Sequence, residues 1–295
     1  MFSDEAIDPS SAPVTLIDAT DPSRCAPDRD VVAVDTETTG LPWYERLIEI
    51  GAVRFRGARV IDRWRMLVDP RRPIPARVTE IHGITDALVA GAPEARVALL
   101  ELQRFCRGAL LIAHNASFDR DILAAEYARA GLTPPPEPLY CTWRFAKHCI
   151  TDAPRYGLTP LAAHLGLPAA EHRALPDAEL ARRVFLAACE RLTEPCTVAT
   201  LDAYATGSGA ALSLRGAVRR ARDLPPHLRP LRGARAKGAV VALTVRGAEG
   251  EAERVVCGVP RALLARGDDG AVDVWGDAGL LESVPFAAIA GVAVG

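Results

Sequence analysis

The sequence of 295 residues lacks several features that would each indicate a particular class of protein. It has no run of about 18 apolar residues, so we expect no membrane-spanning helix and no membrane partner. Its N-terminus has no basic start followed by an apolar run, so we expect no secretory signal. Its seven cysteines form no Cys-x-x-Cys pair, which argues against a disulfide framework and a zinc knuckle. Together these absences indicate a soluble protein of the reducing cytoplasm.

The sequence also has little charge excess and few lysines. Only two of its 35 basic residues are lysine, and the formal net charge is -2. No overall basic character therefore points to nucleic acid, and charge has to be considered region by region. A glycine-rich phosphate-binding loop is absent as well. What the chain does have is a hydrophobic content of 49%, enough for a packed core.

The pattern along the chain divides it into four parts. Residues 1–28 are polar and predict a flexible arm. Residues 29–193 begin with three strand-like runs joined by short links and continue with alternating helical and strand-like patterns. This order predicts an α/β fold, a mixed sheet flanked by helices. Residues 194–238 predict a basic helical or irregular linker, and residues 239–295 a small β-barrel module.

Two carboxylates mark the end of the first predicted strand. The apolar run at residues 31–34 is followed by Asp35 and Glu37, whose side chains point to the same face because side chains alternate along a strand. Two such carboxylates beside a buried run repel each other and require a cation, and oxygen ligands suit Mg²⁺ or Mn²⁺. The alternative is a strand that merely ends in a polar turn.

Two further acids begin predicted helices. Asp119 follows a short strand at residues 110–113, and Asp177 begins the last helix of the α/β region. Favourable interaction with a helix N-terminus is an alternative explanation for each of them. His172 precedes Asp177 and has a side chain suited to general-base chemistry, the alternative being a solvated loop histidine.

Three separated motifs agree in residue type, order and context with one family. They are Asp35-Thr36-Glu37-Thr38-Thr39-Gly40, His114-Asn115-Ala116-Ser117-Phe118-Asp119 and His172-Arg173-Ala174-Leu175-Pro176-Asp177-Ala178. With them, residues 29–192 resemble the DnaQ-like 3′–5′ exonucleases of the DEDDh branch, which includes the proofreading ε subunit of bacterial DNA polymerase III. The resemblance implies a ribonuclease-H-like sheet.

The same resemblance implies a site with two divalent metal ions, Mg²⁺ or Mn²⁺. In that site Asp35 bridges the metals, Glu37 and Asp177 complete the position of the attacking water, and Asp119 supports the second metal. His172 is then the general base. Substrate contacts are expected from Thr38, Leu41, His82, Asn115 and Phe118, with a structural histidine and core packing as the alternatives for His82 and Phe118.

These observations predict a metal-dependent 3′–5′ exonuclease that releases nucleoside monophosphates from single-stranded 3′ ends, DNA favoured over RNA. Two alternatives are a non-catalytic nucleic-acid or partner-binding scaffold on an exonuclease fold and an RNA-specific oligoribonuclease-like enzyme. Residues 239–294 resemble a WYL-type domain of SH3-like fold, although the Trp-Tyr-Leu signature is missing. Because this module departs from the ε subunit, a partnership with a polymerase is not carried over. The basic residues at 215–237 predict either phosphate contacts or a solvated face.

Overall fold

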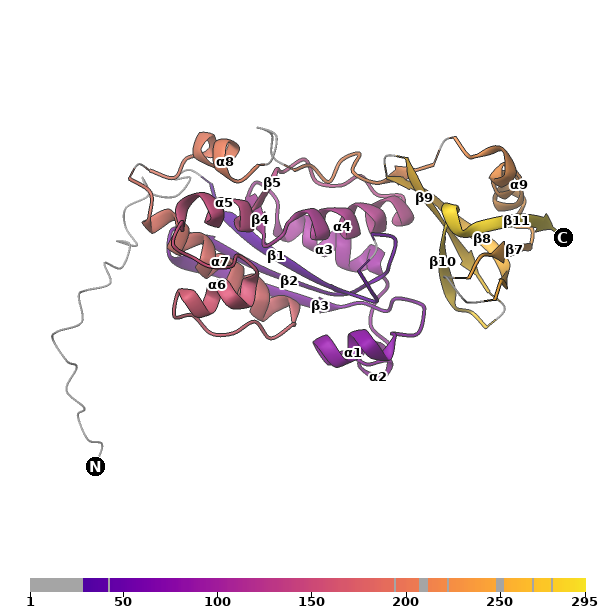
Figure 1. Ribbon diagram of the computed structural model, residues 1–295, viewed down its shortest axis with the longest axis horizontal. Helices are drawn as coiled ribbons and strands as arrows, with labels where there is room; N and C mark the ends of the chain where they lie inside the picture. The colour runs from indigo at the N-terminus through magenta and orange to yellow at the C-terminus, as the bar shows by residue number, and fades with distance from the viewer. Residues whose placement is uncertain are drawn as a thin grey trace, which may run out of the picture.

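The computed structural model describes residues 29–41, 43–193, 195–206, 212–221, 223–247, 252–266, 268–276 and 278–295, without the side chains of residues 219 and 220. The arm predicted for residues 1–28 lies outside this range. Figure 1 shows a larger α/β part, followed in the chain by a smaller part built on a second sheet.

The α/β part contains a five-stranded mixed sheet in the order β3-β2-β1-β4-β5. Its strands are β1 Val31–Thr38, β2 Leu47–Arg56, β3 Arg59–Leu67, β4 Leu110–Ala113 and β5 Leu139–Cys141. The first three strands form the predicted antiparallel meander, and β4 and β5 run parallel to β1. The predicted mixed sheet is therefore confirmed.

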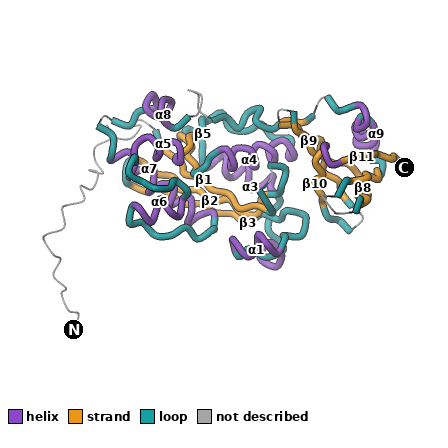
Figure 2. The backbone as a smooth tube through the Cα atoms, viewed as in Figure 1, coloured by secondary structure: helices purple, strands orange, loops and turns teal. Residues whose placement is uncertain are grey.

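Seven helices follow or connect these strands among the described residues up to 193 (Figure 2). They are α1 Ala76–His82, α2 Asp86–Val89, α3 Ala95–Phe105, α4 Ser117–Ala130, α5 Thr142–Cys149, α6 Leu158–His164 and α7 Ala174–Glu190. Helix α4 ends where Gly131 adopts a left-handed conformation (φ 67°), which the sequence predicts because glycine carries no Cβ penalty there.

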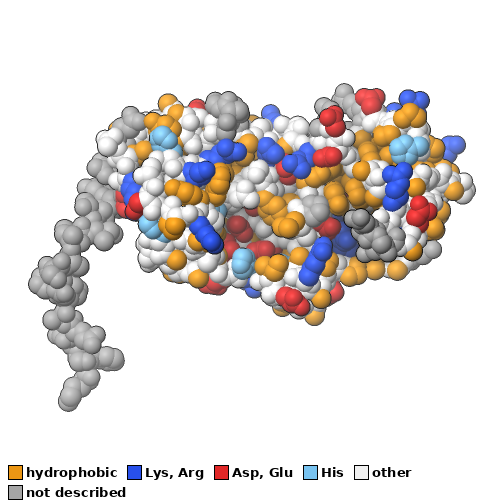
Figure 3. All heavy atoms as spheres, in the orientation of Figure 1, with side chains coloured by type: hydrophobic (Ala, Val, Ile, Leu, Met, Phe, Trp, Pro, Cys, Tyr) orange, Lys and Arg blue, Asp and Glu red, His pale blue; other side chains and the backbone are white. Residues whose placement is uncertain are grey.

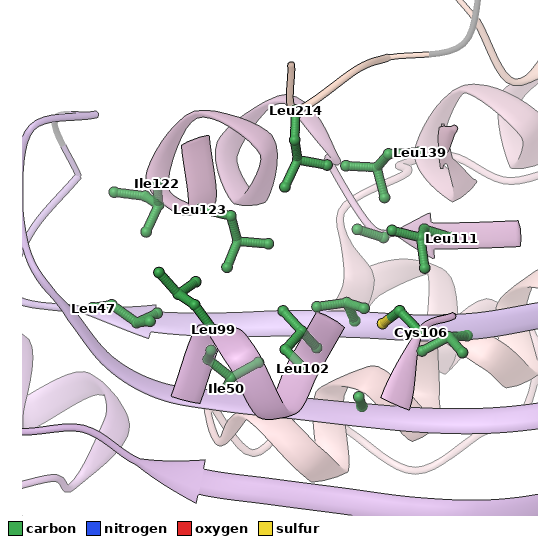
Figure 4. Packing of buried hydrophobic residues seen from close by; sticks show 14 of the residues in the cluster. Leu47, Ile50, Leu99, Leu102, Cys106, Leu111, Ile122, Leu123, Leu139 and Leu214 are labelled. Carbon is green, nitrogen blue, oxygen red and sulfur yellow. The ribbon is translucent and has the colours of Figure 1, made fainter. Parts of the chain in front are cut away.

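Alternating residues of β1 pack into two separate cores, one on each face of the sheet. Val31 and Ala33 pack with residues of α5, α6 and α7, whereas Val32 and Val34 pack with residues of α3 and α4. Figure 4 shows the second of these cores, in which the labelled Leu99 and Leu102 lie close to Leu123. Because this alternation continues along the strand, the next odd-numbered residues, Asp35 and Glu37, are on the α7 side.

The second sheet follows the order β10-β9-β8-β7-β11, with the short β6 paired to β8. Its strands are β6 Arg219–Arg220, β7 Val241–Val245, β8 Arg254–Arg266, β9 Asp269–Trp275, β10 Leu281–Pro285 and β11 Ile289–Val294. Helix α8 Val198–Tyr204 precedes β6 in the chain, and α9 Pro230–Lys237 lies between β6 and β7. The apolar side of α9, with Leu231 and Ala234, packs into the core of the second sheet. A C-terminal β module is thus present.

Two features of this module differ from the prediction. The strand-like runs in its sequence cover residues 240–245, 253–257, 271–275 and 288–294. Strand β8 instead runs on to Arg266, and β10 corresponds to none of these runs. The register shifts between Pro260 and Ala262, and the strand continues past Gly258 and Pro260. No helix in the described part of the chain is long and apolar enough to cross a membrane.

Candidate metal centre

Three carboxylates converge where β1 meets the first turn of α7. Asp35 and Glu37 come from β1, and Asp177 comes from α7. One oxygen of each lies within 4.8 Å of those of the other two. Asp177 also accepts a hydrogen bond from the backbone N–H of Glu171 (2.9 Å), which fixes its orientation. A group of oxygen ligands at this spacing suits a hard divalent cation.

Asp119 lies beside this group, in the first turn of α4. Its side chain is almost fully buried and accepts a hydrogen bond from the Thr36 hydroxyl (2.8 Å). Thr36 lies between Asp35 and Glu37 in β1, so a single strand supplies two of the carboxylates and the donor that orients the fourth. Thr36 was not predicted as a site residue, although it falls within the first motif.

The electrostatics of the site show that its negative charges are poorly compensated. Burial, together with the charges of Asp177, Glu49 and Asp119, raises the pKa of Glu37 to about 8. Burial raises the pKa of Asp119 to about 7 against the hydrogen bond from Thr36. For Asp35, burial followed by the charges of the other three acids raises the pKa well above its ordinary value. A divalent cation would relieve this repulsion by favouring the ionised carboxylates.

A partly buried ion pair that was not predicted from the sequence lies next to the acids. Glu49, fully buried in β2, is directly opposite Glu37 in the strand pairing. It accepts two hydrogen bonds from the guanidinium of Arg173 (2.7 and 3.0 Å) and one from the backbone N–H of Ala174 (3.0 Å). In the sequence, Glu49 could have been noticed as an acid within the apolar run of β2. Its partner Arg173 is identified only by the structure.

Arg173 immediately follows His172, the predicted general base. His172 is exposed, has a positive φ of 51° and precedes the first residue of α7. Burial raises the pKa of Asp177 and the charge of His172 opposes that rise, so the two side chains lie near each other. The bidentate Glu49–Arg173 pair fixes the main chain immediately after His172, where α7 begins.

The two other histidines of the family-like segments differ in position. Buried His82 accepts a hydrogen bond from Ile84 N–H at Nδ1 (3.0 Å). Burial lowers the pKa of His82, and the main chain of Thr38 acts in the opposite direction, which places the ring beside the end of β1. His114 contacts the Thr142 hydroxyl (2.9 Å) and the Tyr156 carbonyl (2.8 Å), and burial lowers its pKa to about 4. His114 is therefore a neutral residue that joins three segments.

The remaining predicted substrate residues lie around the acids in different environments. Thr38 is buried and donates to the carbonyl of Gly40 (2.6 Å), whereas the side chain of Leu41 is 83% exposed. Asn115 is exposed in a left-handed conformation (φ 60°), and half-buried Phe118 packs against the core between the sheet and α3–α4. Leu41 and Asn115 are thus free to contact a ligand, while Phe118 contributes to the core.

A basic surface lies next to the acidic group. Asn115, Arg120, Trp143 and Arg144 line a concavity of about 590 Å³ at the start of α4 and α5. On the same helix, the Lys147 ammonium lies 4.8 Å from the centre of the Trp143 ring. Among the described residues, neither Arg144 nor Lys147 forms an ion pair with a carboxylate. Figure 3 shows acidic side chains in a hollow near the centre of the visible face, with Lys and Arg side chains around it.

Comparisons with known proteins agree with this site. The family model RNase_T, described as exonuclease, matches residues 32–185. DNA polymerase III PolC-type from Streptococcus thermophilus is 37% identical over 155 residues, which is 52% of this chain and 11% of that protein. The PolC-type polymerase of Caldanaerobacter subterraneus is 32% identical over 174 residues, 58% of this chain and 12% of that protein. The chain therefore spans about a tenth of the length of these relatives.

The α/β part was also compared with solved structures of nucleases. Cell-death related nuclease 4 (CRN-4) superposes with a TM-score of 0.50 at 12% identity, covering 56% of this chain and 64% of that one, which supports the fold. Exonuclease X in complex with 5′ overhanging duplex DNA is 26% identical with a TM-score of 0.46, covering 54% of this chain and 91% of that one.

Proposed function

Because the chain belongs to the RNase_T family of exonucleases, of the DnaQ-like 3′–5′ type, we propose that it removes nucleoside monophosphates from single-stranded 3′ ends. The observation that carries this proposal is the convergence of Asp35, Glu37 and Asp177 within 4.8 Å, with Asp119 beside them. DNA is the favoured substrate over RNA because the matched relatives are DNA polymerases of the PolC type.

The four acids would hold two divalent metal ions, Mg²⁺ or Mn²⁺. The donor set fits such ions, since it consists of carboxylate oxygens whose burial raises the pKa values of Asp35, Glu37 and Asp119. Repulsion between the acids adds to the rise for Asp35 and Glu37. When bound, the metals promote ionisation of the attacking water and neutralise charge on the phosphate. Within the protein, Thr36 orients Asp119, and the backbone N–H of Glu171 orients Asp177.

His172 would accept the proton of the attacking water. Its exposed position beside Asp177 puts the ring at the open side of the acidic group, where a water and a phosphodiester can both approach. The imidazole suits this role because its unperturbed pKa is near neutral. The Glu49–Arg173 pair restricts the backbone next to this histidine.

The 3′-terminal nucleotide would lie against Thr38, Leu41 and His82, and the preceding nucleotides would pass Asn115. Beyond Asn115 the strand would reach the concavity lined by Arg120, Trp143 and Arg144. An aromatic ring among cations is typical of surfaces that bind single strands regardless of sequence, since every base has a face that can stack.

The test is digestion of oligonucleotides by the full chain with Mg²⁺ or Mn²⁺. We expect mononucleotide release from a 3′-hydroxyl single strand, less from a 3′-blocked strand, and faster release from DNA than from RNA. Asp35→Asn and His172→Asn should each lower kcat by about 10² or more. The matched controls are Asp62→Asn, in β3, and His164→Asn, whose ring contacts Asp152. If neither metal supports release from any of these strands, the proposed activity is wrong.

A further inference from the structure

Hydrogen bonds join the two ends of the loop between β1 and β2 to each other. This loop comprises residues 39–46, of which residue 42 lies outside the described part, and it directly follows the carboxylates of β1. Thr39 N–H donates to the Arg46 carbonyl (2.8 Å), Arg46 N–H donates to the Thr39 hydroxyl oxygen (3.0 Å), and the Thr39 hydroxyl donates to Glu45 (2.6 Å). The loop carries exposed Leu41, so its position fixes the surface available to a terminal nucleotide.

A single guanidinium joins this loop to the C-terminal β module. Arg129, in the last turn of α4, donates to the backbone carbonyls of Tyr44 and Glu45, the latter at 3.1 Å. Its Nε donates to the carboxylate of Asp273 in β9 (2.7 Å). The side chains of Arg129 and Asp273 are 7% and 1% exposed, so this contact is shielded from water.

The buried charges around Arg129 form a balanced network. Glu126 accepts from Arg129 (3.1 Å) and from the Nε of Arg46 (2.7 Å), the residue at the end of the loop. Asp273 also accepts a hydrogen bond from Ser283 in β10 (2.6 Å). Two arginines thus face two carboxylates. Loss of the Asp273 charge would leave one buried cation without compensation, and Arg129 would have to move or recruit water.

The module contacts the loop through apolar residues and a second segment as well. Trp43 and Tyr44 pack in one cluster with Leu264 and Ala271 of the module. Leu281 N–H of the module donates to the Arg71 carbonyl (2.7 Å), and the neighbouring Arg72 donates to Glu45 (3.0 Å). The β1–β2 loop is therefore held between the α/β part and the module on several sides.

We propose that the C-terminal β module positions the β1–β2 loop for the 3′-terminal nucleotide, with Asp273 as the positioning residue that acts through Arg129. This inference rests on the proposed exonuclease function. Asp273 touches neither the acidic group nor His172 among its described contacts, so its effect is on binding of the strand end and not on bond cleavage.

The experiment compares Asp273→Asn with Arg266→Gln in the full chain. Arg266 also bridges the two parts, pairing with Asp121 at 2.9 Å, and Asp121 keeps Arg120 as a partner (2.7 Å). No hydrogen bond or ion pair joins Arg266 to the described residues of the loop. We expect Asp273→Asn to raise KM for a short single strand about tenfold or more with kcat within about twofold, since the loop would contact the terminal nucleotide and carries none of the proposed catalytic groups. Arg266→Gln should leave both parameters unchanged.

Hydrogen exchange gives a second measurement that does not require activity. The amides of Thr39 and Arg46 should exchange faster in Asp273→Asn than in Arg266→Gln, because the loop has lost a fixed anchor. If Asp273→Asn does not fold, the double substitution Arg129→Leu with Asp273→Leu replaces it, since it leaves Arg46 and Glu126 balanced and still removes the donors to Tyr44 and Glu45.

Two results would overturn the inference: unchanged KM and unchanged loop exchange in a folded Asp273 variant, or an equal rise in KM for Arg266→Gln. A wild-type chain that cleaves no strand with either metal would contradict the proposed function instead, and the exchange measurement would still decide whether the module holds the loop.

Discussion

At the scale of single residues, Glu49 and Arg173 connect the sheet to the segment that carries His172. They act on Glu37 with opposite signs: the charge of Glu49 raises the pKa of Glu37, and the charge of Arg173 lowers it. Replacing either residue breaks the same hydrogen-bonded pair. The two replacements therefore share a structural effect and differ in their electrostatic one.

We predict that Arg173→Ala moves the onset of Mn²⁺ binding to higher pH and Glu49→Gln moves it to lower pH. The reason is that the metal binds the ionised form of Glu37, which loses a stabilising cation in the first variant and a destabilising anion in the second. Calorimetric titration of each variant with Mn²⁺ between about pH 6 and 9 measures the shift. Shifts of the same sign would mean that the pair acts by geometry alone.

Sequence motifs could identify the four acids and His172 as candidates because each lies at an end of an element, within a recurring local pattern. They could not identify the buried pairs. Arg173 and Glu49 are 124 residues apart, and Arg129 and Asp273 are 144 residues apart. Such contacts depend on how distant elements pack, and nothing in the local pattern of either partner specifies the other.

At the scale of elements, the approach of β2 to the start of α7 determines where Asp177 lies. Gly51, opposite Asp35 in the strand pairing, is so close to α7 that an added Cβ would lie 2.2 Å from the main chain of Ala174 and Leu175. Two backbones can approach this closely only where one residue has no side chain.

We predict that Gly51→Ala lowers the free energy of unfolding by about 3 kcal/mol or more, because backbone atoms cannot move aside as a flexible side chain can. Displacement of α7 should also weaken metal binding, since Asp177 would move away from Asp35. Thermal unfolding with and without Mn²⁺ measures both effects. The control is Gly233→Ala in α9, where an added Cβ has nothing within 4 Å and a gain of about 1 kcal/mol at most is expected.

The exposed face of α5, which carries Arg144 and Lys147, should contact long nucleic-acid strands but not a dinucleotide. Arg144→Ala combined with Lys147→Ala should weaken binding of a long single strand and leave hydrolysis of a dinucleotide nearly unchanged, since only the long strand reaches this face. The slope of log K against log salt should fall by about 1.4, or about 0.7 for each phosphate that the variant no longer neutralises. Fluorescence anisotropy in an Asp35→Asn background measures the binding and its salt dependence, and dinucleotide hydrolysis is measured in the chain that retains Asp35. Arg104→Ala, on α3 and paired with Glu101, is the control. An unchanged slope would place the strand elsewhere.

Element prediction was accurate where periodicity and end signals agreed, as in α4 with its terminal Gly131. It was incomplete in the C-terminal module, where the strand-like run covers residues 253–257 only, whereas β8 continues to Arg266. Gly258 lies where an added Cβ would be 2.2 Å from the Trp275 carbonyl oxygen, so the glycine allows β8 and β9 to pack closely. Glycine and proline in a strand can mark close approach and a bulge as well as a break, and local sequence does not distinguish these cases.

At the scale of the whole molecule, the acidic group links stability to pH and to metal. Glu37 and Asp119 have pKa values near 8 and 7 in the folded chain, well above those of unfolded carboxyls. The folded state therefore binds more protons than the unfolded state up to about pH 8, and the free energy of unfolding falls as pH rises through this range. Buried His82 and His114, with lowered pKa values, oppose this trend only below about pH 6.5.

We predict that the metal-free protein melts at a lower temperature at pH 8.5 than at pH 6.5, and that Mn²⁺ reduces this difference by stabilising the ionised carboxylates at the higher pH. Glu37→Gln should also reduce it, since the variant removes one raised carboxyl and lessens the repulsion on Asp35. Glu101→Gln, on the exposed side of α3, is the control and should melt with the same pH dependence as the wild type. Thermal melts in chelator and in Mn²⁺ at both pH values measure these effects. A melting temperature that rises from pH 6.5 to 8.5 in chelator would show that the acids are compensated without metal, contrary to the proposed two-metal site.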